Sequence, residues 1–197
     1  MQNIVPKDSR YVPLTQQKSC CVPTCLQMIM YKNNIPLIAA EEIGHYLGLI
    51  VHPDNDNLFY NVSTSKTPPI SGYGTQITKS KYEPTKALKK MRIPLKVKVI
   101  PANKFKTNKH LEKYLSSVEK DNKDVLLCFN HGVLIGEKSK SGGHVVVFDR
   151  ITKKGIRIID TSPNKPKWRI VSVGKMLTAM KKHRSKKSGG VWSITVT

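Results

Sequence analysis

The sequence predicts an α+β fold, with helices gathered in the first half of the chain and an antiparallel sheet in the second. Most segments whose apolar residues have helical spacing lie before residue 125, whereas from Val125 onward short runs rich in Val and Ile predict strands. Residues 51–81 are rich in Asn, Ser, Thr, Pro and Gly, which indicates a long irregular connection. With no repeat or linker in 197 residues, we expect one domain over residues 1–197.

The first helix is predicted to begin at or just after Cys21. In the run VPTCLQMIM that follows, apolar residues have helical spacing, and Pro23 is tolerated because the first turn needs no N–H from it. Further helices are expected near residues 39–49, 84–91, 109–120 and 173–183.

Short apolar segments predict the strands, at residues 95–100, 125–130, 144–151, 156–160 and 191–197. The third and fourth are joined by the short turn at residues 152–155, which indicates a hairpin. Residues at the open end of a hairpin face each other, so His144 and Asp160 are expected to meet there.

The charge is strongly positive. The chain carries 34 Lys and Arg against 13 Asp and Glu, a net charge of +21. This predicts attraction to an acidic or anionic partner and leaves nucleic acid open. The lysines are spread along the chain with few aromatic residues between them, so a solvated basic surface is the simpler interpretation. The densest cluster, KKHRSKK at residues 181–187, is suited to phosphate contacts or to the end of a helix.

Cysteine usage and the N-terminal residues predict a cytoplasmic protein. Four cysteines, two of them adjacent, do not resemble a secreted disulfide framework. The first residues lack the basic start and apolar stretch of a signal peptide, and no window has the length of a membrane span.

Cys21 is a candidate nucleophile because of its predicted place at a helix N-terminus. Free N–H groups and the helix dipole there favour a thiolate. A nucleophile also needs a base, and His144 follows two glycines and opens the apolar run VVVF. Asp160, sixteen residues later, is placed to orient the imidazole. The pattern predicts a Cys-His-Asp triad.

Several stretches together resemble the papain-like cysteine peptidases. They are Cys21 with Gln16 shortly before it, GGHVVVFDRI and IRIIDTSP. The likeness is strongest to stand-alone relatives of the bacterial peptidases that remove bacteriocin leaders after a double glycine. GYGTQITKSKYEPTKALKKM, DVLLCFN and VWSITV also fit that group in order. The resemblance implies a papain-like fold, in which the nucleophile helix of a helical N-terminal half packs on a C-terminal antiparallel sheet.

The resemblance also implies a role for each site residue. Cys21 would be the nucleophile, His144 the general base and later the general acid, and Asp160 the residue that orients the imidazole. The side-chain amide of Gln16 and the backbone N–H of Cys21 would bind the oxyanion, whose stabilisation is a large part of such catalysis. No cofactor and no metal are implied.

Two assignments stay open from the sequence alone. Cys20 is a rival to Cys21 as nucleophile, and Gln17 is a rival to Gln16 as oxyanion donor. Zinc bound by Cys20, Cys21, Cys25 and a histidine is disfavoured, because the chain has no C-x-x-C pair and adjacent cysteines suit tetrahedral ligation poorly.

Five other residues that draw attention are interpreted as structural. Cysteine packs as a small apolar group, and tryptophan is more often a packing residue than a substrate platform. No carboxylate is placed to orient the histidine among them. These residues are Cys25, Cys128, His131, Trp168 and Trp192.

The sequence therefore predicts a cysteine peptidase that hydrolyses a peptide bond in a peptide or protein through a thioester acyl-enzyme. Two alternatives remain. The same triad serves acyl or amide transferases and deamidases of the transglutaminase type. A protein that keeps a peptidase scaffold without catalysis would instead use its basic surface for binding. The substrate pocket is expected from residues 51–81 and the loop at 131–143.

Overall fold

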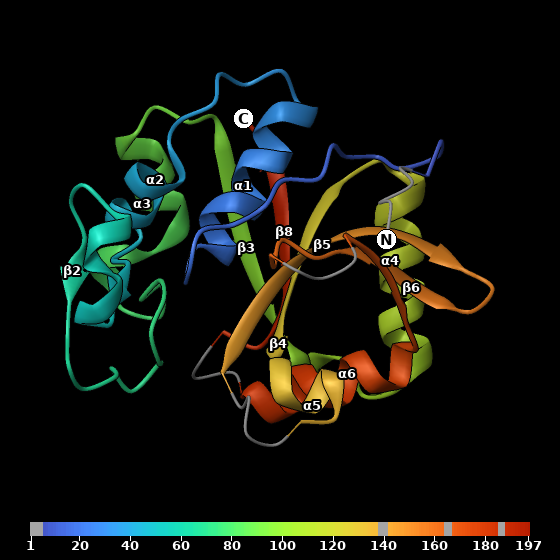
Figure 1. Ribbon diagram of the computed structural model, residues 1–197. Coiled ribbons are helices and arrows are strands. Elements are labelled where there is room, and N and C mark those ends of the chain that lie inside the picture. The colour runs from blue at the N-terminus through green and yellow to red at the C-terminus, as the bar shows by residue number, and fades with distance from the viewer. Residues whose placement is uncertain (1–5, 138–141, 164–166, 185–187) are drawn as a thin grey trace.

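The computed structural model describes residues 6–137, 142–163, 167–184 and 188–197, and its centre is a six-stranded antiparallel sheet (Figure 1). The strand order is β3-β8-β4-β5-β6-β7. The bounds are β3 (Leu95–Pro101), β4 (Asp124–Asn130), β5 (Gly143–Thr152), β6 (Gly155–Ile159), β7 (Trp168–Val171) and β8 (Gly190–Val196). The predicted antiparallel sheet is confirmed, and β7 is an additional strand.

In the part of the chain that the structure describes, six α-helices accompany the sheet. They are α1 (Cys21–Lys32), α2 (Ala40–Tyr46), α3 (Pro84–Lys90), α4 (Asn108–Lys120), α5 (His131–Ile135) and α6 (Val173–His183). The predicted helices are found, whereas α5 occupies part of a segment expected to be a loop. The described part of the basic cluster at 181–187 is the end of α6 and Arg184, and residues 185–187 lie outside the described residues.

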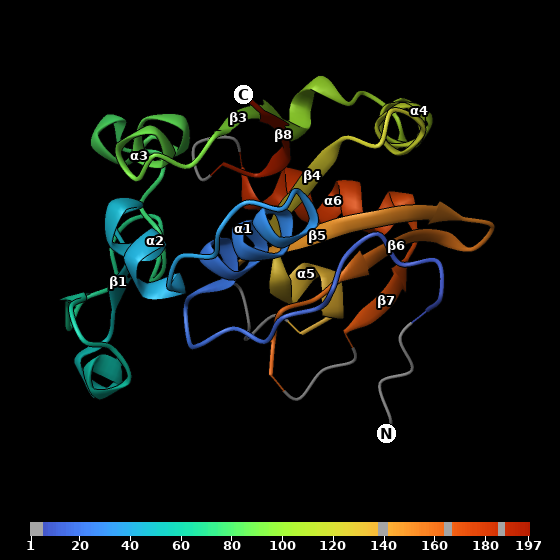
Figure 2. The same ribbon diagram turned by 90° about the horizontal axis from the view of Figure 1, so that it is seen from above.

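Two apolar cores cover opposite faces of the sheet. On β5, Val145 and Val147 pack in the core that contains α1, α2 and α3, whereas Val146 and Phe148 pack in the core that contains α4 and α6. A strand buried on both faces needs an unbroken apolar run, which explains the sequence VVVF. In both views α2 and α3 lie together beside α1, away from α4 (Figures 1 and 2).

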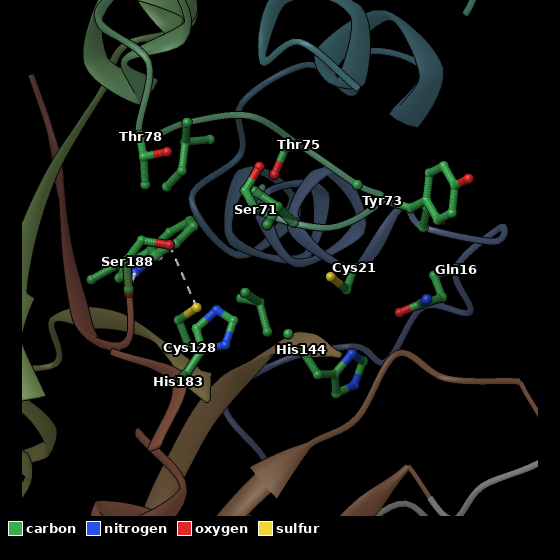
Figure 3. Close-up of a pocket in the computed structure, with 17 residues that line it drawn as sticks. Gln16, Cys21, Ser71, Tyr73, Thr75, Thr78, Cys128, His144, His183 and Ser188 are labelled. Carbon is green, nitrogen blue, oxygen red and sulfur yellow. Dashed lines mark hydrogen bonds between the residues drawn. The ribbon is translucent and has the colours of Figure 1, made fainter. Parts of the chain in front are cut away.

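The connection between α2 and α3 is largely irregular, as predicted. It contains a short parallel pair, β1 (Ile50–Val51) with β2 (Ser63–Thr64), and two 3₁₀ turns, η1 (Pro53–Leu58) and η2 (Ser80–Tyr82). A third 3₁₀ turn, η3 (Ala102–Lys104), follows β3. The connection returns along α1 at residues 71–78, where it meets the start of that helix (Figure 3).

The N-terminal segment is fixed to the β5–β6 hairpin by charged side chains. Asp8 pairs with Arg150 at 2.6 Å and with Arg157 at 2.9 Å. The backbone N–H of Arg10 donates to Asp149 Oδ1 at 2.9 Å, next to an irregularity in the β5–β6 register. After these contacts the chain runs toward the open end of the hairpin, where Gln16 lies.

Within the described ranges, none of the helices has the length and apolar character needed to cross a membrane. The expectation of a single domain over residues 1–197 stays a prediction.

Candidate active site

The two adjacent cysteines point into different surroundings. Cys21 is the first residue of α1 and is half-buried, with its side chain at a surface pocket. Cys20, the residue before the helix, is fully buried against Leu49 and Val51, and this burial raises the pKa of its thiol to about 12. The geometry therefore exposes Cys21, and not Cys20, to the pocket.

The pocket beside Cys21 has a volume of about 250 Å³ (Figure 3). Its walls come from the start of α1, the returning connection at 71–78, β4 near its end, the start of β5, the end of α6, and β8 with the segment before it. Of the loop predicted at 131–143, Gly143 is the described residue that contributes, and residues 138–141 lie outside the described residues. The polar lining residues are Gln16, Ser19, Cys21, Ser71, Tyr73, Thr75, Thr78, Cys128, His144, His183 and Ser188.

His144 lies near the start of β5 and faces the same pocket as Cys21 (Figure 3). Its Nε2 is 2.9 Å from Asp160 Oδ1, which leaves Nδ1 for the thiol. The residue is 7 % exposed. Burial lowers the pKa of His144, but hydrogen bonds with Asp160 and with the Cys21 thiol outweigh it and raise the pKa to about 9. The site thus favours an imidazolium at neutral pH.

Asp160 directly follows β6 and is fully buried. Besides His144, its carboxylate accepts a hydrogen bond from the backbone N–H of Ser162 at 3.0 Å and pairs with Arg169 at 2.8 Å. Burial raises the pKa of Asp160, but the hydrogen bonds from His144 and Ser162 hold it well below the ordinary value. The carboxylate is therefore an anion with a fixed orientation toward the imidazole.

Gln16 lies at the pocket, close to the start of α1 (Figure 3). Its backbone N–H donates to the carbonyl of Thr161 at 2.9 Å, and its Oε1 accepts a hydrogen bond from the Thr161 hydroxyl. Gln17 is exposed, and its amide reaches the Leu58 carbonyl at 3.5 Å instead. The structure brings Gln16 together with Cys21, His144 and Asp160 and leaves Gln17 outside.

Three residues of the site were not expected from the sequence. The ring of His131, which begins α5, lies 5.1 Å from the His144 ring centroid, so this histidine belongs to the surroundings of the site. His183, from the end of α6, closes the pocket near Gly143. Arg169 reaches Asp160 from β7. The sequence signal nearest to these residues is the pair Gly142–Gly143. A glycine can mark a place where another group comes close to the backbone, and the His183 ring lies against Gly143 in this way.

The remaining two cysteines are buried, and Cys128 also lines the pocket. Cys25 and Cys128 are buried in the core on the α1 side of the sheet, and burial raises the pKa of both thiols, that of Cys128 to about 12. In the part of the chain that the structure describes, no three His, Cys, Asp or Glu side chains come together as metal ligands would. Within the described residues, Cys20, Cys21 and Cys25, the zinc donors that the sequence disfavoured, do not form such a group.

No protein-family model matches the chain, and no curated protein matches it. Among solved structures that do match is the crystal structure of a candidate C39-like peptidase from Bacillus anthracis. The TM-score is 0.57 at 15 % sequence identity, over 94 % of this chain and 95 % of that chain. The chain shares the fold of that protein. The match confirms the predicted α+β class, and the chemistry must be argued from the site.

Proposed function

We propose that this protein is a cysteine peptidase that cleaves a peptide bond in a peptide or protein substrate. The observation that carries the proposal is the arrangement of a half-exposed thiol at the N-terminus of a helix, a buried imidazole in the same pocket, and a buried carboxylate 2.9 Å from that imidazole. The fold shared with a candidate C39-like peptidase supports the proposal.

In the proposed reaction the proton of the Cys21 thiol has passed to Nδ1 of His144 before the substrate is attacked, in keeping with the imidazolium that the site favours. The thiolate then attacks the scissile carbonyl carbon, and the carbonyl oxygen becomes an oxyanion that binds the Gln16 amide and the Cys21 backbone N–H. Asp160 keeps the imidazole in the required orientation and stabilises its positive charge.

Collapse of the tetrahedral intermediate breaks the C–N bond, and His144 gives its proton to the leaving amine. The acyl group remains on Cys21 as a thioester. Water then attacks the thioester while His144 accepts a water proton, the C–S bond breaks, and a carboxylic acid leaves. Each proton lost by a nucleophile returns to a leaving group, so the residues are restored.

The proposal also includes a narrower family, a kind of partner and a location in the cell. The stretches GGHVVVFDRI and IRIIDTSP support a place among stand-alone relatives of the leader-processing peptidases. The net charge of +21 supports an acidic or anionic partner, whose binding should weaken as salt is raised. A cytoplasmic location is proposed from the cysteine usage.

The test is intact-protein mass spectrometry after brief exposure to iodoacetamide near neutral pH. We expect one rapid label on the wild type and on Cys20→Ala, none as fast on Cys21→Ala, and a much slower one on His144→Ala. Cys20→Ala is the matched control because it removes the adjacent thiol and leaves the pocket intact. Labelling that is indifferent to His144 would contradict the proposal and favour the non-catalytic binding protein.

Hydrolysis and acyl transfer are separated by the fate of the acyl group. With a labelled peptide substrate, a peptidase releases a free acid even when a small amine is added. A transferase forms the amide in proportion to the amine, and a deamidase releases ammonia from a glutamine side chain.

A further inference from the structure

Gln16 is held by a single residue from the other side of the site. Thr161 uses both its main chain and its side chain. Its carbonyl accepts the Gln16 N–H at 2.9 Å, and its hydroxyl donates to Gln16 Oε1. The two residues are separated by 145 positions in the sequence, so no local turn imposes this contact.

The position of Thr161 is itself fixed. Its side chain is fully buried, and the backbone on either side is anchored. The Asp160 N–H donates to the Lys167 carbonyl at 2.8 Å, and the Lys167 ammonium donates to the Ser162 carbonyl at 3.1 Å. The hydroxyl of Thr161 therefore has a defined place from which to donate.

A glutamine amide needs such a partner to act as an oxyanion donor. The –CONH₂ group presents an oxygen on one side and an NH₂ on the other, and only the NH₂ side stabilises an oxyanion. A hydroxyl that donates to Oε1 fixes the orientation of the amide group and leaves the Nε2 hydrogens free to donate into the pocket. An amide that rotates freely would present the wrong atom for part of the time.

We propose that Thr161 is a positioning residue, whose hydroxyl holds the Gln16 amide with its NH₂ directed to the oxyanion. This inference rests on the proposed function. It makes residues 160–162 one unit with three tasks. Asp160 orients His144, Thr161 orients Gln16, and the Ser162 N–H orients the Asp160 carboxylate.

The test compares two probes that differ in one respect. Iodoacetamide alkylates a thiolate by displacement of iodide and builds no oxyanion, whereas attack on the carbonyl of p-nitrophenyl acetate does. We expect Thr161→Val, which has nearly the same shape, to slow p-nitrophenyl acetate turnover by about 10- to 100-fold and to leave the iodoacetamide rate unchanged. Thr161→Ser, which keeps the hydroxyl, should restore most of the turnover.

Two further variants sharpen the comparison. Gln16→Ala should lower p-nitrophenyl acetate turnover as much as Thr161→Val does. The double variant should lose no more turnover than Gln16→Ala alone, because both changes remove the same interaction. Thr152→Val is the matched control, since its hydroxyl bonds to the Gly155 carbonyl in the hairpin turn and not to the site. Thermal unfolding of each variant shows that it is folded.

The outcomes separate the two proposals. Unchanged ester turnover in Thr161→Val, or an equal fall with both probes, would overturn the positioning role. A wild type that iodoacetamide labels no faster than free glutathione would overturn the peptidase itself, and the positioning role with it. A loss confined to the ester and rescued by serine supports both.

Discussion

Replacing Asp160 by asparagine should lower the pKa of His144 from about 9 to near or below the ordinary 6.5. Burial already lowers this pKa, and the contacts that raise it are those with Asp160 and Cys21. Asparagine has the same shape but no charge, so it keeps the packing and removes the main support of the imidazolium. The difference between 6.5 and about 9 corresponds to about 3 kcal/mol at about 1.4 kcal/mol per pKa unit.

The sign of the effect on stability follows from the folded and unfolded pKa values. Because the pKa of His144 is higher in the folded protein, its contribution is complete below pH 6.5 and is lost as the pH rises through about 9. The lowered pKa of Asp160 makes the same interaction disappear as the pH falls below 3.8. The ion pair is therefore fully stabilising between about pH 3.8 and pH 6.5.

The assay is an NMR titration of the His144 ring, with urea unfolding at about pH 6 and about pH 9.5. Wild type should lose about 3 kcal/mol more than Asp160→Asn between the two pH values. Asp121→Asn removes an exposed carboxylate and is the charge-matched control. A His144 pKa that stays near 9 in Asp160→Asn would refute the reasoning, because the imidazolium would then owe its stability to other groups.

Two predictions concern a wall of the pocket and a buried carboxylate at the start of β4. In Gly143→Ala the new Cβ would lie 2.5 Å from His183 Cε1, so the ring must move, and we expect slower alkylation of Cys21 in a protein that still folds. Truncation of buried Asp124 to alanine removes the partner of Lys32 at 2.6 Å and of the Tyr11 hydroxyl at 2.7 Å. The free energy of unfolding from urea titration should fall by about 3–5 kcal/mol. A loss no larger than that of Asp121→Ala would contradict a structural role for this carboxylate.

The parts of the site that the sequence predicted are those set by local periodicity. The helix begins at Cys21 because the apolar spacing starts there and Pro23 fits its first turn. His144 and Asp160 meet because they stand at the open end of one hairpin, in which Val147 pairs with Ile159. A helix start and the pairing within one hairpin each involve residues that are close in the sequence, so the pattern of one segment is enough to predict them.

The parts that escaped prediction depend on contacts between distant segments. Gln16 and Gln17 are equivalent in sequence and are distinguished by Thr161. The short helix α5 carries start and stop signals, since the Asn130 side chain accepts from Val133 N–H and Gly136 has φ +82°. Five residues are too few to show a helical period. For the same reason the four residues of β7, which supply Arg169, gave no clear strand pattern.

The place of β8 in the sheet has a consequence for how the protein folds. This strand pairs with β3 on one side and β4 on the other, although it follows β7 and α6 in the sequence. Neither early strand can complete its backbone hydrogen bonds until the chain through α6 has been made, and such long-range closure slows folding. Trp192 of β8 and Ser188 before it also line the pocket. A nascent chain should therefore carry the Cys21 thiol without a finished pocket, and the protein should complete this pocket only when β8 pairs with its neighbours.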